Sequence, residues 1–141
     1  MNTAILSQLY VHQSEVKSAM AAKRALLAAE TMDTMATANA RWRLTRMLTG
    51  YQVFKHQRIF DPLSRHGTPR DSDAAKQMKI GCVAMNQTFR TYLARWTASG
   101  IEGHEAEYRR DARAILAMID RHILSERRTI EMLLTSDRQA A

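Results

Sequence analysis

The sequence predicts an all-α protein, an antiparallel up-down-up-down four-helix bundle that forms a single domain over residues 1–141. First, 141 residues make about one domain, and 5 Gly and 2 Pro are too few for a protein built from strands and turns. Second, three breaks divide the chain into four helix-forming segments of similar length. Third, apolar residues recur within these segments at helical spacing.

The breaks fall at residues 30–33, 64–72 and 99–103, where polar residues, Gly or Pro interrupt the helix-forming sequence. Asp33 and Ser72 are expected N-caps, since their side-chain oxygens can accept the free amides of a first helical turn. Glu105 and Glu107 suit the positive N-terminal end of the last helix. Helices joined by such short connections pack as antiparallel neighbours.

Apolar stripes give most of the expected helices an inward face. The third segment has the clearest stripe, because its apolar residues are spaced 4, 3, 4, 3 and 4 apart. In the second segment, apolar residues spread over more than half of the circumference and leave the inward face open. The stripes of the first, third and fourth segments are Ile5, Leu9, Val16, Ala19 and Met20; Met78, Cys82, Met85, Phe89, Tyr92 and Trp96; and Leu116, Ile119, Ile123, Ile130 and Leu133.

Composition restricts the setting and the function class. The lone cysteine, Cys82, cannot form an internal disulfide, so a reducing, cytoplasmic setting is expected. The sequence predicts no export signal and no membrane span, because it lacks a signal-like N-terminus and a run of 18 apolar residues. A phosphate-binding glycine loop and a nucleophile elbow are also missing, so we expect a protein that is not an enzyme.

The net charge of +7 is compatible with an anionic partner. The arginines are scattered over several helical faces, often beside acids, as on an ordinary solvated surface. No helix-turn-helix or aromatic-basic RNA motif is present, so the sequence does not favour a nucleic-acid partner. A protein partner, with an acidic surface, is the preferred expectation, and a homodimer is an alternative.

If the four helices fold back at the three breaks and pack antiparallel, residues near 12, 51, 82 and 122 lie at the same height along the bundle. Glu126 lies on the apolar stripe between Ile123 and Ile130, where a carboxylate needs a partner. His122, four residues earlier, shares its helical face. His12 extends the stripe of the first segment. Such groups suit iron, manganese or zinc, although buried His and Glu also pair with each other or with a nearby cation such as Lys55.

These residues resemble those of the hemerythrin-like, or HHE cation-binding, bundles in their bacterial single-domain form. The resemblance covers most of the chain. It is carried by His12 in Leu9–Val16, by the second-helix ending Tyr51–Leu63 with its Phe-Asp-Pro-Leu close, and by His122 and Glu126 in the last helix. It implies a four-helix fold and non-haem iron as the cofactor.

The chain departs from the family pattern in its second and third helices. In the family, the second and fourth helices each offer His-x-x-x-Glu, whereas the register set by Phe60–Leu63 places Tyr51 and Lys55 at the second-helix positions. An ammonium there repels a cation. The alternative register, His56 with Asp61, has a spacing of five that is poor for chelation. The predicted metal set is therefore His12, His56, His122 and Glu126.

Three functions follow as hypotheses. The first is a hemerythrin-like sensor or regulatory bundle with a degenerate or mononuclear metal site, acting through a protein partner. In this hypothesis, Lys55 can replace the lost metal by pairing with Glu126. The second is an intact non-haem iron protein that binds oxygen, nitric oxide or iron. The third is a basic binding or assembly module without metal.

Overall fold

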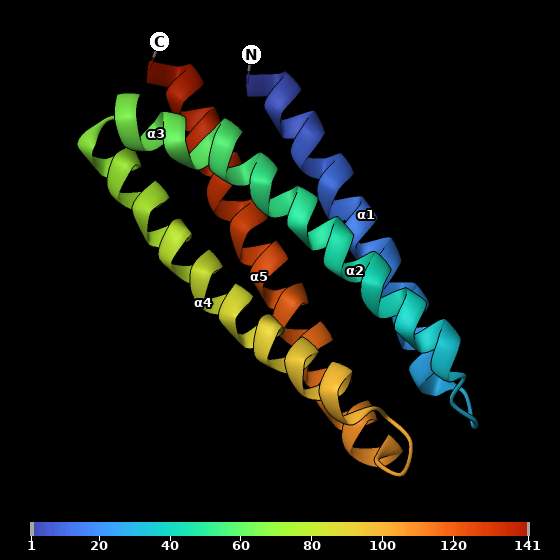
Figure 1. Cartoon of the computed structure of the whole chain (residues 1–141). Helices are drawn as coiled ribbons and strands as arrows, with labels where there is room; N and C mark the ends of the chain where they lie inside the picture. The colour runs from blue at the N-terminus through green and yellow to red at the C-terminus, as the bar shows by residue number, and fades with distance from the viewer. Residues whose placement is uncertain (1, 141) are drawn as a thin grey trace.

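The structure is a computed structural model that describes the backbone of residues 2–140 and the side chains through Thr135. It is all-helical, as predicted, with four long helical stretches (Figure 1). The chain reverses direction at each of the three connections in Figure 1. The elements are α1 (Asn2–Ala28), α2 (Thr34–Lys55), a π-helical turn η1 (His56–Phe60), α3 (Asp61–His66), α4 (Pro69–Ser99) and α5 (Glu105–Ala140).

The helix boundaries follow the predicted breaks, with one correction. Asp33 caps α2 as expected, because its Oδ1 accepts the amide of Ala36 at 3.0 Å. Ser72 is not the N-cap of the next helix. Helix α4 begins earlier, at Pro69, with Thr68 as its cap, since proline is well suited to a first helical turn. The Ser72 hydroxyl instead donates to the carbonyl of Ser64 at 3.1 Å.

The connection between α4 and α5 depends on glycine. Gly100 has a φ of 71° and Gly103 a φ of 82°, in the left-handed region that other residues rarely adopt. Gly100 ends α4, and α5 begins with Glu105 and Glu107 in its first turn, as the sequence predicts. These acids favour the helix start because the N-terminus carries partial positive charge.

The second long stretch contains a feature that the sequence does not predict. Residues His56–Phe60 form a π-helical turn, and the amide of Asp61 donates to the carbonyl of His56, five residues earlier. Helices α2 and α3 therefore form one continuous rod with a widened turn between them. Such turns are rare and frequently lie beside functional residues. This one directly follows Lys55.

The core confirms the predicted stripes. In α4, Cys82, Met85, Phe89, Tyr92 and Trp96 are buried, and Met78, the first residue of the predicted stripe, is half-buried. The stripes of α1 and α5 are also buried, apart from the half-buried Ile5 at one end. In α2, the inward face is formed by Leu44, Leu48, Tyr51 and Lys55 together with Thr37, Gln52 and Phe54, whereas Trp42 is 66% exposed.

Several buried polar side chains interrupt this core, among them two groups at different levels of the bundle. Lys55, Glu126 and Gln13 lie near the middle of the helices, and Lys23 lies closer to the end formed by the α4–α5 connection. Within residues 2–140, no helix combines the length and the apolar character needed to cross a membrane.

Candidate functional site

The centre of the bundle holds a buried ion pair. Lys55, at the C-terminal end of α2, places its Nζ 2.6 Å from Oε1 of Glu126 on α5. The side chain of Lys55 is 0% exposed and that of Glu126 is 4% exposed. Lys55 Nζ also lies 4.1 Å from the centre of the Tyr51 ring, which adds a cation–π contact. The pairing of Lys55 with Glu126 predicted from the level alignment is confirmed.

Tyr51 and Gln13 extend the polar network toward α1. The Tyr51 hydroxyl donates to Oε1 of Glu126 at 2.9 Å, and Nε2 of Gln13 donates to the Tyr51 hydroxyl at 2.9 Å. Nε2 of Gln13 also lies 3.3 Å from the carbonyl of Ile123. Burial, followed by the charge of Glu126, raises the pKa of Tyr51 well above its usual range, so the phenol stays protonated and can donate.

Cys82 connects the ion pair to the α2–α4 side of the bundle. Its Sγ lies 3.2 Å from Lys55 Nζ and donates to Oε1 of Gln52. Nε2 of Gln52 donates in turn to Oδ1 of Asn86 at 3.1 Å. The lone cysteine is buried, as predicted, but it belongs to a polar network rather than to purely apolar packing.

His122 completes the centre from α5. Its Nε2 lies 3.1 Å from Oε1 of Glu126, but the two groups are not aligned for a hydrogen bond. Burial alone would lower the pKa of His122, yet the neighbouring Cys82 and Glu126 outweigh burial and raise it to about 9. Burial opposes ionisation of Glu126 in the same way, but His122 and Lys55 lower its pKa. The centre thus favours a carboxylate held between two cations.

Three of these side chains also form a potential metal-binding group. One donor atom each from Cys82, His122 and Glu126 can be chosen so that all three lie within 4.8 Å of one another. Oε2 of Glu126 has no hydrogen-bond partner among the described residues. A hollow of about 290 Å³ between α4 and α5 is lined by His122 and Glu126, and it gives this group a path to the surface. A thiolate, an imidazole and a carboxylate are a donor set that suits zinc.

The structure brings together two members of the predicted metal set, His122 and Glu126, and places the other two elsewhere. His12 is half-buried and stacks on Phe54, with ring centres 4.7 Å apart. Gln13, the next residue along α1, provides the inward polar group instead.

His56 is the second member that lies apart. It packs edge-on against Phe60 at 5.2 Å within the π-helical turn, and burial, followed by Lys55 and Lys79, lowers its pKa. The register that pairs His56 with Asp61 is not favoured, because Oδ1 of Asp61 accepts from Nζ of Lys79 at 2.9 Å. His66 and His104 are exposed.

A second buried polar cluster, absent from the sequence-based predictions, surrounds Lys23. Nζ of Lys23 is 2.6 Å from the Tyr108 hydroxyl, which also accepts from the Tyr92 hydroxyl at 3.1 Å. The partner of this lysine is thus a phenol rather than a carboxylate. Burial, followed by the charge of Arg41, lowers the pKa of Lys23 to about 7. A lysine on a helical stripe gives no hydropathy signal, so the sequence alone did not indicate this cluster.

Comparisons with known proteins add no relative. The chain matches no family model, no curated protein and no solved structure.

Proposed function

We propose that the chain is a hemerythrin-like regulatory bundle in which the Lys55–Glu126 ion pair stands where a metal ion would lie, and which acts through a protein partner without catalysing a reaction. The observation that carries this proposal is the fully buried Lys55 ammonium, 2.6 Å from Glu126. A buried charge pair of this kind fixes which helix faces meet, because any slip leaves both charges unpaired.

The positions of Tyr51 and Lys55 support the resemblance on which the proposal rests. They occupy the positions that the hemerythrin-like pattern assigns to the second-helix histidine and glutamate. Both side chains contact Glu126, the carboxylate of the fourth-helix motif. In this proposal, the ligand positions keep their place while their chemistry changes from metal ligands to a phenol and an ammonium.

We propose that the four helices of this bundle run up-down-up-down, and contacts at both ends of the bundle support this topology. At one end, Nδ2 of Asn2 donates to the carbonyl of Leu134 at 2.9 Å. At the other, Lys23 of α1 contacts Tyr108 of α5. Helices α1 and α5 thus run in opposite directions side by side. We also propose a reducing, cytoplasmic setting, in which the lone thiol of Cys82 stays unmodified.

A di-iron centre does not fit these residues. The ammonium of Lys55 lies within the shell that the ligands would form, and it would repel a cation. His12 and His56, which an intact iron site requires, do not converge on Glu126. We therefore derive no chemistry through bound iron.

A mononuclear metal site is the second candidate, and the grouping of Cys82, His122 and Glu126 favours it. It would need Lys55 to withdraw from Cys82 Sγ, 3.2 Å away, so that the thiolate and carboxylate could bind a cation. The hollow between α4 and α5 gives the ion access. In this form the bundle would respond to a metal rather than work without one.

Elemental analysis and absorption spectra of protein purified without a metal-binding tag distinguish these functions. The expected result, after anaerobic loading with ferrous iron or zinc and desalting, is far less than one ion per chain. Two irons per chain with near-ultraviolet oxo-bridge absorption would overturn the proposal. One zinc ion per chain, retained in wild type and lost in Cys82→Ser and Glu126→Ala, would replace it with the second candidate.

A further inference from the structure

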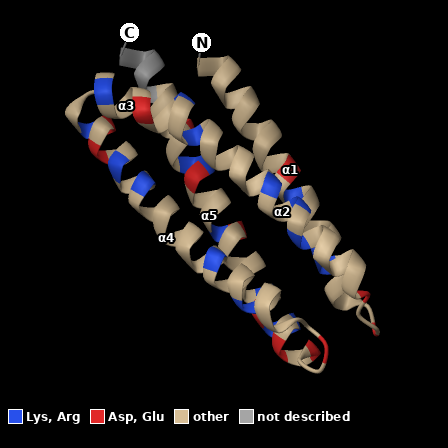
Figure 2. Ribbon diagram, in the orientation of Figure 1, with Lys and Arg blue, Asp and Glu red and all other residues tan. Residues whose placement is uncertain are grey.

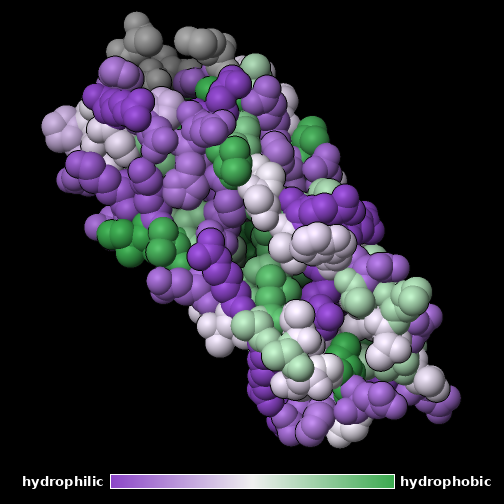
Figure 3. Space-filling view, in the orientation of Figure 1, coloured by the Kyte–Doolittle hydropathy of each residue, from purple (hydrophilic) through white to green (hydrophobic). Residues whose placement is uncertain are grey.

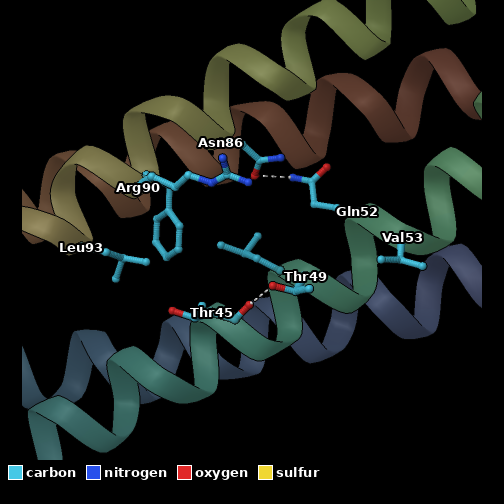
Figure 4. Close-up of a pocket in the computed structure, with 9 residues that line it drawn as sticks. Thr45, Thr49, Gln52, Val53, Asn86, Arg90 and Leu93 are labelled. Atoms are coloured by element: carbon cyan, nitrogen blue, oxygen red, sulfur yellow. Dashed lines mark hydrogen bonds between the residues drawn. The ribbon is translucent and has the colours of Figure 1, made fainter.

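The side of the bundle between α2 and α4 is hollowed along much of its length. One hollow of about 200 Å³ is lined by α2 and α4 residues that include Leu48, Gln52 and Phe89 (Figure 4). A second, of about 410 Å³, adjoins it and is lined by Arg41, Trp42 and Thr97 among others. Thr45 and Leu93 line both, so the two form one groove, here called the α2–α4 groove. Figure 3 shows this hollowed face with apolar residues exposed within it.

The floor of the α2–α4 groove is apolar. Leu48 and Phe89 lie at its base, nearly covered, and Leu93 is half-buried between the two hollows. At the rims, Trp42 is 66% exposed and Val53 is 48% exposed. An exposed tryptophan beside an apolar floor is a frequent anchor in protein interfaces.

Charge on the walls has a single sign. Residues 34–60 and 74–101, which contain both walls, include no Asp or Glu. The exposed Arg90 lines the groove, and so does the half-buried Arg41, whose Nη1 is covered. The Arg90 side chain extends along the α4 wall with its guanidinium toward Asn86 (Figure 4). Arg95, on the same helix as Arg90, pairs with Glu107 and Asp111 of α5. In Figure 2, blue residues without red ones occupy the facing middle parts of α2 and α4.

The shape of the groove fits a helix. Its α2 wall runs from Ala38 to Val53, and at 1.5 Å per residue this is roughly 22 Å, about four turns. A groove with an apolar floor and basic walls accepts an amphipathic helix whose apolar stripe lies inward and whose flanks are acidic. A nucleic acid would place phosphates against the walls but leave the apolar floor without a matching surface.

We propose that the α2–α4 groove binds an acidic amphipathic helix of a partner protein. This inference rests on the proposed function and specifies the chemistry of its partner. The end of the groove that holds Gln52 and Asn86 lies directly over Cys82, because Gln52 bonds to both. A bound helix would therefore contact the residues that connect the surface to the Lys55–Glu126 pair.

The test uses a synthetic helical peptide of about 16 residues, the length of the groove, with leucines at i, i+4, i+7 and i+11 and glutamates on both flanks. Fluorescence anisotropy with the full chain is expected to give saturable binding with a blue shift of Trp42 emission. Arg90→Glu is expected to weaken binding about tenfold or more through charge reversal. Arg121→Glu, an exposed substitution on α5, is the matched control and should leave binding unchanged.

Two further probes make the result specific. The same peptide with lysines in place of glutamates, and the acidic peptide with serines in place of leucines, are both expected to fail to bind. Absence of binding by the acidic peptide, or binding equally strong to Arg90→Glu, would overturn the inference. So would tighter binding of single-stranded DNA with the same dependence on Arg90, which would identify a nucleic acid as the occupant. None of these results changes the metal content, so the proposed function is tested separately.

Discussion

The ammonium of Lys55 and the carboxylate of Glu126 form an ion pair 2.6 Å long at the centre of the bundle, and both side chains are buried. Burying the two charges carries a desolvation penalty, and their mutual attraction offsets this penalty only while both partners are present. The two residues belong to different helices, α2 and α5. The ion pair therefore restricts how these two helices can be aligned. A single substitution in the pair should lower the free energy of unfolding far more than replacement of both residues.

Lys55→Met is expected to lower the free energy of unfolding by about 3–5 kcal/mol, because it leaves Glu126 buried without its cation. Urea denaturation at neutral pH measures this change. Lys79→Met is the matched control: Lys79 and Asp61 form a half-exposed pair, so the loss should be about 1 kcal/mol or less. The double variant Lys55→Met with Glu126→Leu should regain most of the lost stability. Similar losses at Lys55 and Lys79 would contradict the assignment.

Lys23 is expected to contribute a rise in stability with pH above neutrality, opposed by His122, whose raised pKa gives a contribution that falls between pH 6.5 and about 9. The pKa of Lys23 is lowered from 10.5 to about 7 in the folded state, so between these values the unfolded chain binds more protons at this residue. Below pH 7 the burial penalty is fully present, and it is relieved as pH rises through the folded pKa. The relief is on the order of 5 kcal/mol over the whole window.

Lys23→Met isolates this effect from the titration of other groups. Denaturant titration from pH 6 to 10 measures the unfolding free energies of wild type and variant across this window. As pH rises, the unfolding free energy of wild type should increase relative to that of Lys23→Met. Parallel stability curves for the two proteins would show that Lys23 is not buried as the structure describes.

Removal of the Lys55 side chain is expected to create a cation site from the existing donors. In Lys55→Ala the thiol of Cys82, the imidazole of His122 and the carboxylate of Glu126 no longer face an ammonium. Cobalt(II) should then bind with a thiolate-to-metal charge-transfer band and raise the melting temperature of this variant. Wild type should show a much weaker band under the same conditions. Adding Cys82→Ser to Lys55→Ala should abolish the band, and equal binding by wild type would contradict this account.

The thiol of Cys82 is expected to be protected in the native protein. It is 0% exposed and donates to Gln52. Reaction of Cys82 with an aromatic disulfide reagent should therefore be limited by transient unfolding that exposes the thiol, and it should become fast in denaturant. The more stable the protein, the slower the reaction, so Lys55→Met should accelerate it. Immediate reaction of the native wild type would show that the thiol is accessible.

Much of the architecture could be predicted because its signals are local. Glycine, proline and the Asp33 cap mark the connections, and the apolar stripes of α4 and α5 determine which faces are buried. That Glu126 needs a buried partner was also predictable, since a carboxylate lies on an apolar stripe, but the sequence left His122, Lys55 or an arginine as alternatives.

The details of the site could not be predicted because polar residues carry no periodicity of their own. Positions 12 and 13 both follow Leu9 at nearly helical spacing, and only the continuation through Val16, Met20 and Lys23 selects Gln13 as the inward residue. Lys23 itself resembles any solvated lysine in the sequence. The π-helical turn leaves no mark in the hydropathy pattern, which is already diffuse in the second segment.

The π-helical turn at His56–Phe60 sets the rotational phase between the two halves of a single rod. In a regular α-helix each residue advances by about 100°, so one surplus residue in a turn shifts everything beyond it by roughly that angle. Tyr51 and Lys55 face the bundle on one side of the turn, and Phe60 and Leu63 face it on the other. Deleting one residue here would preserve helicity and length almost unchanged, yet it would turn the inward residues of one half away from the core.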